Sequence, residues 1–344
     1  MISAAWQGAP VRRILTVLLA FTTLGLAPQR AFAPVFETDF PDPFILPLKG
    51  GYLAYATNAG GFAANVQMAF STDLKTWQLL RSGERLQDAL PTLPRWAASG
   101  RTWAPEVIRA GGRYVLYFTA ADRASGLQCV GVASAADPRG PFVSASETPL
   151  VCQKALGGTI DPSPFRDADG SLHLLFKSDG NNPKYLVPSR IWVQPLTPDG
   201  LAVTGNPSEL IRNDQRWEWR VVESPTMLRD PDGKYVLLFS ANHFGWEPDQ
   251  RMSNYAIGYA RCATVAGPCV KAAENPILKS DREGGACLSG PGHQTVFQAE
   301  GKLQVVFHAW AATAKCRFAD KGRYMYIAPL AWSAGAPVIA PANP

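Results

Sequence analysis

The segment Asp161-Pro162-Ser163-Pro164-Phe165 decides the fold, because its pattern returns along the chain. A glycine pair precedes it, and the Asp-rich turn at 167–170 and the apolar run from Leu172 to Phe176 follow it. A short strand, a tight turn and a second apolar strand are the start of an antiparallel hairpin. The segment therefore predicts a hairpin whose first strand begins with a carboxylate.

The same pattern occurs five times, and an ionisable residue opens each copy: Asp42, Glu106, Asp161, Glu223 and His293. Successive copies lie roughly 55 to 70 residues apart, within or just above the range of propeller repeats. Each copy has room for about four strands, the content of one blade, and the first strand of a blade lines the central channel. We therefore expect an all-β, five-bladed β-propeller whose active site lies in the central channel, where these side chains converge.

The rest of the sequence between Pro34 and Pro344 also favours strands. Its apolar stretches are short, rich in Val, Leu, Tyr and Phe, and bounded by Gly, Pro, Asp and Ser, and it shows no long amphipathic helix. We expect Trp77 to pack between blades. Evenly spaced repeats favour a single domain over residues 34–344.

The first 33 residues have the three parts of a secretory signal peptide. Arg12-Arg13 precede an apolar run from Ile14 to Leu26, and Ala31-Phe32-Ala33 offers a small-residue cleavage site. The apolar run is too short to cross a bilayer as a permanent anchor, although an uncleaved anchor is the alternative. We therefore expect residues 1–33 to be removed and the protein to be secreted.

The charge balance and the absence of several motifs argue against other functions. The chain has 33 Lys and Arg and 28 Asp and Glu; the signal segment holds three of the arginines and no acid, which leaves 30 against 28. This near balance does not indicate nucleic acid or an anionic membrane as a partner. Motifs typical of serine hydrolases, phosphate-binding loops and dinucleotide sites do not occur.

Six cysteines in an exported chain indicate disulfides, because extracellular compartments are oxidising. Six cysteines allow 15 pairings, and the sequence does not choose among them. Proximity along the chain favours the pairs Cys129–Cys152, Cys262–Cys269 and Cys287–Cys316.

The repeated motifs resemble those of glycoside hydrolase family 43, whose members are inverting enzymes on five-bladed propellers that attack arabinose- and xylose-containing polysaccharides. The similarity covers essentially the whole chain after the signal segment. The matching motifs are Phe40-Pro41-Asp42-Pro43-Phe44, Thr102-Trp103-Ala104-Pro105-Glu106, Ile160-Asp161-Pro162-Ser163-Pro164-Phe165, Val222-Glu223-Ser224-Pro225 and Gly290-Pro291-Gly292-His293.

The resemblance implies a role for each opening residue. Asp42 matches the general base, Asp161 the auxiliary acid that tunes and orients its partner, and Glu223 the general acid. His293 matches an axial histidine that in many relatives lies near a bound calcium or other ion, usually through water. Glu106 is a channel residue without a settled catalytic role. The chemistry itself requires no cofactor.

These roles also make physical sense. Inverting hydrolysis needs one carboxylic acid to protonate the leaving oxygen and one carboxylate to deprotonate water, about 6.5–9.5 Å apart so that the water fits. A third carboxylate near the acid raises the pKa of that acid. We therefore expect Asp161 to keep Glu223 protonated near neutral pH.

Four further residues are candidates for contacts with the sugar: Phe44, Trp103, Glu106 and Arg323. An indole ring such as that of Trp103 can pack against the C–H face of a pentose, although packing in the blade core is the alternative. Lys177, Asp179, Asn181, Trp217 and Trp219 are candidates for the rim.

The sequence thus predicts a secreted, monomeric, inverting hydrolase of α-L-arabinofuranosyl linkages in plant cell-wall polysaccharides such as arabinan or arabinoxylan. A β-xylosidase and a galactan-cleaving enzyme are alternatives with the same chemistry. A non-catalytic carbohydrate-binding propeller is disfavoured, because binding alone does not need all three carboxylates. A retaining fructosidase-type propeller would differ in stereochemistry. The sequence does not distinguish endo from exo action.

Overall fold

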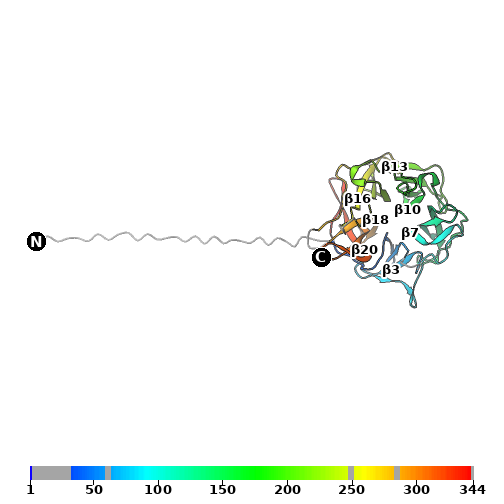
Figure 1. The fold of residues 1–344 in the computed structure, drawn as a ribbon, viewed down its shortest axis with the longest axis horizontal. Coiled ribbons are helices and arrows are strands. Elements are labelled where there is room, and N and C mark those ends of the chain that lie inside the picture. Colours follow the sequence, from blue (N-terminus) through cyan, green and yellow to red (C-terminus); the bar gives the residue numbers. More distant parts are fainter. Residues whose placement is uncertain (2–31, 59–62, 247–251, 283–286, 342–344) are drawn as a thin grey trace.

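The protein is a five-bladed β-propeller, as predicted, with the blades arranged around a central axis (Figure 1). A computed structural model describes Met1 and residues 32–341, apart from 59–62, 247–251 and 283–286. Within these residues the only helices are two 3₁₀ turns, η2 (Lys154–Leu156) and η3 (Arg216–Glu218). The predicted signal peptide lies almost entirely outside the described residues. No helix among the residues that can be described is long and apolar enough to cross a membrane.

Each blade is an antiparallel sheet built from consecutive strands. Blade 1 contains β1 (Phe44–Leu48), β2 (Gly51–Ala56), β3 (Gln67–Ser71) and β4 (Gln78–Leu79), and the small hairpin β5 (Arg81–Ser82) and β6 (Arg85–Leu86) follows it. Blade 2 contains β7 (Ala97–Ala110), β8 (Arg113–Asp122) and β9 (Gln128–Ala135). Blade 3 contains β10 (Thr159–Arg166), β11 (Leu172–Ser178), β12 (Arg190–Pro195) and β13 (Ser208–Arg212).

Blade 4 contains β14 (Val222–Arg229), β15 (Tyr235–Ala241), β16 (Ala256–Cys262) and β17 (Cys269–Lys271), and blade 5 contains β18 (Ser289–Ala299), β19 (Lys302–Ala312), β20 (Phe318–Ser333) and β21 (Ala336–Ile339). Blade 2 thus has three strands where four were expected. Two isolated bridges to β9, from Val143 to Ser134 and from Val151 to Val130, stand in the place of its outer strand.

The hydrophobic core is divided into five clusters, each shared by two neighbouring blades. Alternate residues of a second strand belong to different clusters: Leu174 and Phe176 of β11 pack toward blade 2, and Leu175 packs toward blade 4. Because successive strand residues point to opposite faces, a blade buried on both faces needs a continuous apolar run. Trp77 lies in the cluster between blades 1 and 5, as expected.

The ring is closed by the segment that precedes β1. The backbone N–H of Phe40 donates to the carbonyl of Arg323 in β20 over 2.9 Å, and Phe36 forms a bridge with Met325 of the same strand. The Phe40 side chain is 0% exposed and belongs to the cluster shared by blades 1 and 5. The first and last blades are therefore joined by hydrogen bonds and apolar packing.

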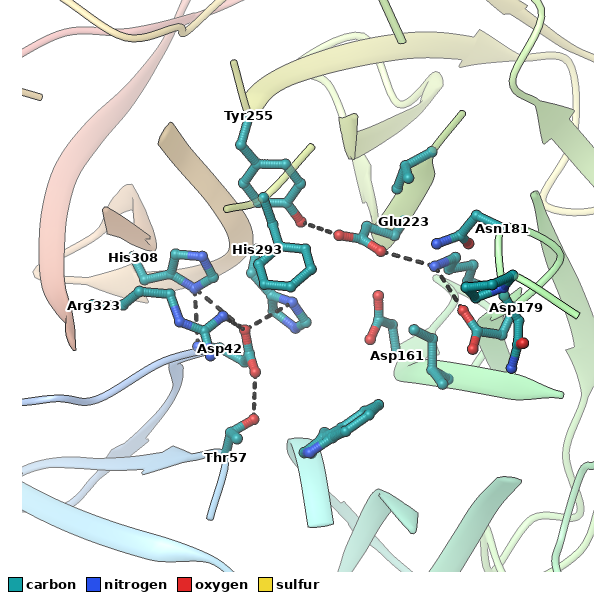
Figure 2. Close-up of a pocket in the computed structure, with 17 residues that line it drawn as sticks. Asp42, Thr57, Asp161, Asp179, Asn181, Glu223, Tyr255, His293, His308 and Arg323 are labelled. Carbon is teal, nitrogen blue, oxygen red and sulfur yellow. Dashed lines mark hydrogen bonds and ion pairs between the residues drawn. The ribbon is translucent and has the colours of Figure 1, made fainter. Parts of the chain in front are cut away.

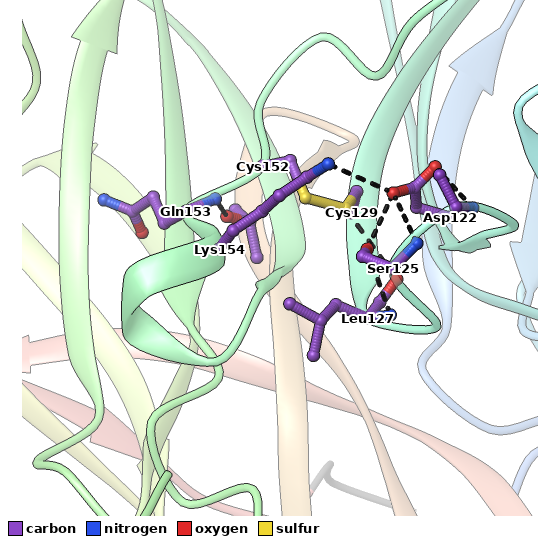
Figure 3. The surroundings of a disulfide bond; sticks show 9 residues. Asp122, Ser125, Leu127, Cys129, Cys152, Gln153 and Lys154 are labelled. Carbon is purple, nitrogen blue, oxygen red and sulfur yellow. Dashed lines mark hydrogen bonds and ion pairs between the residues drawn. A yellow bond between two sulfur atoms is a disulfide. The ribbon is translucent and has the colours of Figure 1, made fainter. Parts of the chain in front are cut away.

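Three disulfides join the pairs that chain proximity favoured: Cys129–Cys152, Cys262–Cys269 and Cys287–Cys316. Figure 3 shows the first of them, which ties β9 to the segment leading into η2. Next to it, Lys154 Nζ lies 3.4 Å from Asp122 Oδ2. The three bonds use all six cysteines of the chain, and none of them connects blade 1 to blade 5.

Because ring closure is non-covalent, Phe40→Ala should destabilise the whole propeller. Removing a fully buried phenylalanine costs about 3–5 kcal/mol through lost burial and the cavity left behind. We expect a loss of this size in the free energy of unfolding, measured by urea denaturation of the disulfide-intact protein. Val143→Ala is the control, because Val143 is 66% exposed and surface changes usually stay within about 0.5 kcal/mol. Equal stability of the two variants would contradict this account of closure.

Candidate active site

Five equivalent residues, one in each blade, have a left-handed backbone conformation where the inner strands begin. They are Asp42 (φ 56°), Ala104 (φ 48°), Asp161 (φ 55°), Ser224 (φ 51°) and His293 (φ 51°). In blades 2 to 5 this residue lies where the pairing of the first two strands shifts register. Such bulges bend a strand and re-aim its side chains. Of these residues, Asp42, Asp161 and His293 line the pocket described below, whereas in blades 2 and 4 the preceding residue, Trp103 or Glu223, lines it instead.

The backbone N–H of each of these residues donates a hydrogen bond to a side chain of the preceding blade, with blade 5 preceding blade 1. The five bonds run from Asp42 to His308 Nδ1 (3.0 Å), from Ala104 to Thr57 Oγ1 (2.9 Å), from Asp161 to Thr119 Oγ1 (3.2 Å), from Ser224 to Asp161 Oδ2 (2.9 Å) and from His293 to Ser240 Oγ (2.8 Å). All five are buried, so they form a closed ring that joins every blade to its neighbour at the level of the candidate active site.

The three predicted catalytic carboxyl groups, Asp42, Asp161 and Glu223, line a single pocket to which all five blades contribute residues (Figure 2). The pocket has a volume of about 420 Å³, which is in the usual range for small-molecule sites. Two of the four predicted sugar contacts, Trp103 and Arg323, also line it.

Asp42 is surrounded by donors and positive charge. Its Oδ2 accepts a hydrogen bond from Thr57 Oγ1. Its Oδ1 lies 3.1 Å from Arg323 Nη1 and 3.3 Å from the Nδ1 atoms of His293 and His308. Burial disfavours the carboxylate, but Arg323 and after it His293 outweigh burial and hold the pKa of Asp42 well below its usual value. Asp42 is therefore ionised, as a general base requires.

His308 supports this arrangement as a neutral ring. Burial and the nearby Arg323 guanidinium lower the pKa of His308 to about 4. A neutral imidazole has one nitrogen free to accept, which is why Nδ1 can take the hydrogen bond from the Asp42 backbone. The sequence indicated only that His308 could border the channel.

Glu223 is held by two donors, one on each oxygen. Lys177 Nζ donates to Oε2 over 2.9 Å and lies 3.2 Å from Asp179 Oδ1, and the Tyr255 hydroxyl donates to Oε1 over 2.8 Å. The Lys177 side chain is 1% exposed, so this ion pair is screened little by water. Burial favours the neutral acid, but Lys177 and then Tyr255 outweigh it and lower the pKa of Glu223.

Asp161 lies beside Glu223 and has the opposite shift. Its Oδ2 accepts the backbone N–H of Ser224, the residue after Glu223. Burial raises the pKa of Asp161 to about 6; His293 opposes this effect, and the adjacent Glu223 carboxylate adds to it. Two carboxyl groups this closely coupled titrate as a pair. In the free protein, the proton of the pair therefore resides on Asp161 at mildly acidic pH.

The proton of the pair thus resides on Asp161 and not on Glu223, which corrects our expectation that Asp161 would keep Glu223 protonated. No sequence pattern indicated that a buried lysine contacts Glu223, and Lys177 was expected only at the rim. Its positive charge stabilises the ionised form of Glu223 and leaves the proton to Asp161. Tyr255 and Thr57 were also missed, because a tyrosine or threonine beside a strand carries no distinctive motif.

Two of the predicted sugar contacts, Phe44 and Glu106, are not in this pocket. They line a second pocket together with Ser163, Thr226 and Thr295. Each of these residues lies two positions after the left-handed residue of its blade, on the same face of the inner strand and farther along the channel. The sequence interpretation treated Glu106 as equivalent to Asp42, whereas the equivalent residue in blade 2 is Ala104.

His293 lines the candidate active site, but its surroundings do not fit a directly bound metal ion. The described residues contain no group of three or more His, Cys, Asp or Glu side chains that could hold one. The carboxylate nearest to His293, that of Asp42, already faces the Arg323 guanidinium. An ion held near His293 through water, as the family resemblance implies, stays a prediction, and no catalytic step is assigned to it.

The fold and the pocket define a propeller with three buried carboxyl groups in a single pocket. The chain belongs to glycosyl hydrolases family 43, whose family model matches residues 32–337.

Relatives in this family carry names for arabinan- and xylan-degrading enzymes. The chain is 26% identical over 299 residues to an extracellular endo-α-(1→5)-L-arabinanase of Bacillus subtilis, covering 79% of this chain and 58% of that protein. It is 23% identical to an extracellular exo-α-(1→5)-L-arabinofuranosidase of Cellvibrio japonicus, with 80% of each chain covered. An endo-1,4-β-xylanase structure from Bacteroides thetaiotaomicron superposes with a TM-score of 0.72 at 28% identity, covering 90% of this chain and 97% of that one.

The charges around the carboxyl pair predict the pH dependence of any hydrolysis that this pocket performs. Asp42 must be ionised, and its pKa is low, so it does not limit activity at mildly acidic pH. The Asp161–Glu223 pair must hold a proton, which it loses as pH rises through about 6. In Lys177→Met the pair should keep its proton to higher pH, because Lys177 lowers the pKa of both acids. We expect the alkaline limb of kcat/KM to move up by about 1–3 pH units, the usual effect of one close charge.

Lys177→Arg is the matched control, since it keeps the positive charge and should leave the limb near its wild-type position. An alkaline limb that stays in place, or moves to lower pH, in folded Lys177→Met would show that Lys177 does not govern the proton of the pair.

Proposed function

We propose that the protein is a secreted glycoside hydrolase that cleaves α-L-arabinofuranosyl linkages of arabinan or arabinoxylan with inversion of configuration. One observation carries this proposal: an ionised Asp42 and a proton-holding Asp161–Glu223 pair line the same pocket. Inverting hydrolysis needs one carboxylate and one carboxylic acid at the same time.

In the proposed reaction, water attacks the anomeric carbon from the side of Asp42, and the bond to the leaving oxygen breaks on the side of Glu223. Asp42 takes the proton of the attacking water. Because Asp161 holds the proton of the pair in the free protein, Asp161 first passes it to Glu223, and Glu223 then donates it to the leaving oxygen. Arg323 keeps Asp42 ionised, His308 accepts the backbone N–H of Asp42, and the Ser224 N–H fixes Asp161. Loss of the proton from Asp42 to solvent and reprotonation of the pair complete the cycle.

The sugar is assigned from the relatives. The arabinanase of B. subtilis and the arabinofuranosidase of C. japonicus both carry names for α-(1→5)-L-arabinosyl cleavage, and both are named extracellular. These names support arabinan as substrate and secretion of this chain. We further propose that the protein acts as a monomer, because all three carboxyl groups come from one chain.

A second candidate is cleavage of xylosyl linkages in xylan. The 28% identity to a structure named endo-1,4-β-xylanase favours it, as does a 78-residue match at 38% identity to a xylosidase/arabinosidase of Humicola insolens. The catalytic steps would be the same, and the sugar contacts would differ.

The test is the release of reducing sugar by the wild-type protein from arabinan, arabinoxylan, xylan and galactan, together with aryl α-L-arabinofuranoside and aryl β-D-xyloside. We expect release from arabinan and from the arabinofuranoside. Release from xylan and the xyloside alone would select the second candidate. Binding without any product over days would show that the propeller only binds carbohydrate.

The role of Glu223 is tested by its dependence on the leaving group. Glu223→Gln cannot donate a proton, so we expect hydrolysis of natural glycosides to fall by about 10²–10⁴-fold. Aryl glycosides with an acidic phenol need little protonation and should lose far less activity. Asp42→Asn is the control: loss of the base should slow both kinds of substrate equally. If Glu223→Gln slowed both equally, Glu223 would not be the proton donor.

A further inference from the structure

Trp310 of β19 lies beside the candidate active site, but it does not line the pocket and has no part in the proposed reaction. It follows His308 by two positions, so the two side chains are on the same face of the strand. In the pairing of β19 with β20, Trp310 lies opposite Arg323. Both of these neighbours line the pocket. The indole ring is therefore placed to act on the site through its neighbours.

The ring of Trp310 contacts the guanidinium that keeps Asp42 ionised. Arg323 Cζ lies over this ring, 5.7 Å from its centroid, and Arg323 Nη1 lies 3.1 Å from Asp42 Oδ1 (Figure 2). Fixing a long arginine side chain in one conformation costs rotamer entropy. A cation–π contact offsets part of that cost, and it is stronger where water is excluded. Because the Arg323 side chain is only 19% exposed, the ring helps to hold Arg323 where it meets Asp42.

The indole N–H of Trp310 contacts a different part of the site. Trp310 Nε1 donates a hydrogen bond to the carbonyl of Phe244 over 2.6 Å. Phe244 lies three residues after the end of β15, in blade 4, and lines the pocket. Because Phe244 is 49% exposed, packing alone does not fix its position, and its backbone must be held by other contacts. The hydrogen bond from blade 5 supplies such a contact.

Phe318, at the start of β20, connects Trp310 to the same segment of blade 4 a second time. The centroid of the Phe318 ring lies 5.7 Å from that of Trp310 at an interplanar angle of 73°, and 5.3 Å from that of Trp246 at 59°. Edge-on and tilted aromatic pairs at these distances are favourable. Trp246 lies two positions after Phe244. The indole is therefore itself supported where it holds Phe244.

We propose that Trp310 is a positioning residue with two separable contacts: its ring holds Arg323 beside Asp42, and its N–H fixes Phe244 in the wall of the pocket. One side chain of blade 5 thus supports both the base and a wall that blade 4 contributes, although it touches neither the sugar nor a reacting atom. The inference rests on the proposed function, because it takes Asp42 as the base.

Trp310→Phe tests the N–H contact, because it keeps an aromatic ring beside Arg323 and removes the donor to Phe244. Losing one hydrogen bond should raise KM for the glycoside that the wild type hydrolyses about fivefold. The turnover number kcat should stay within about twofold, since the contact with Arg323 is kept. In a Phe244→Ala background, Trp310→Phe should raise KM less than about twofold, because the side chain that the N–H positions is already gone. A rise of the same size in both backgrounds, or no rise in either, would overturn this contact.

Trp310→Leu tests the ring contact, because it removes the ring beside Arg323 together with the N–H. It should also lower kcat about tenfold, since a base that its cation holds less firmly is less well placed. In an Arg323→Met background, Trp310→Leu should lower kcat less than about twofold further. An unchanged kcat in folded Trp310→Leu, or a tenfold fall in the Arg323→Met background as well, would overturn the ring contact.

Trp332→Leu is the matched control. Trp332 is a tryptophan of the same strand, β20, that carries Arg323, but it packs in the cluster between blades 4 and 5 and lines neither of the two pockets. The control should leave KM and kcat within about twofold of their wild-type values. If Trp332→Leu changed KM and kcat as much as Trp310→Leu does, the Trp310 effects would report a general loss of structure, and the proposal would be wrong.

Calorimetric binding of an oligosaccharide to Glu223→Gln, with and without Trp310→Phe, measures the N–H contact without turnover. The affinity should fall about fivefold in the double variant, and an unchanged affinity would overturn the contact. Failure of the wild type to hydrolyse any arabinosyl or xylosyl substrate would instead contradict the proposed function. In that case the calorimetric comparison still decides whether Trp310 positions Phe244.

Discussion

The closed ring of five buried hydrogen bonds is the constraint on which the site depends. A left-handed backbone costs a non-glycine residue of order 1–2 kcal/mol, and one equivalent residue in every blade adopts it at the same place. The N–H that each of these residues turns toward its neighbour is met by a side chain of the preceding blade. The propeller thus fixes the positions of Asp42, Asp161 and Glu223 through its own backbone, before any sugar binds.

The charged groups of the site form two clusters, one around Asp42 and one around Glu223. On one side, Arg323, His293 and His308 surround Asp42, and the Arg323 charge above all keeps it ionised. On the other side, Lys177 and Tyr255 occupy both oxygens of Glu223, and Asp161 keeps the proton. One carboxylate and one acid therefore coexist in a pocket where burial alone would favour three neutral acids. If Glu223 is the general acid, as we propose, its contact with Lys177 is compatible with that role because the proton is held on the neighbouring Asp161.

The sequence predicted the architecture and most of the site, because both depend on local patterns. Apolar runs flanked by turns mark the blades, and the Asp-Pro motifs at Asp42 and Asp161 mark the points where the inner strands begin. The sequence did not show that Glu106 lies two positions after the blade-2 residue equivalent to Asp42. That offset depends on where the bulge in the first strand of blade 2 occurs. It also could not show that Lys177 contacts Glu223, because the two residues lie 46 positions apart and meet only when blades 3 and 4 pack together.

The central claim is that Asp42 activates water on one side of the sugar while the Asp161–Glu223 pair protonates the leaving oxygen on the other. Proton NMR of the first sugar released from an α-L-arabinofuranosyl oligosaccharide, recorded before the product mutarotates, tests this directly. We predict that the β-anomer forms first, because a single displacement by water inverts the anomeric carbon. The α-anomer as first product would contradict the claim, since it would require a carboxylate to attack the sugar itself.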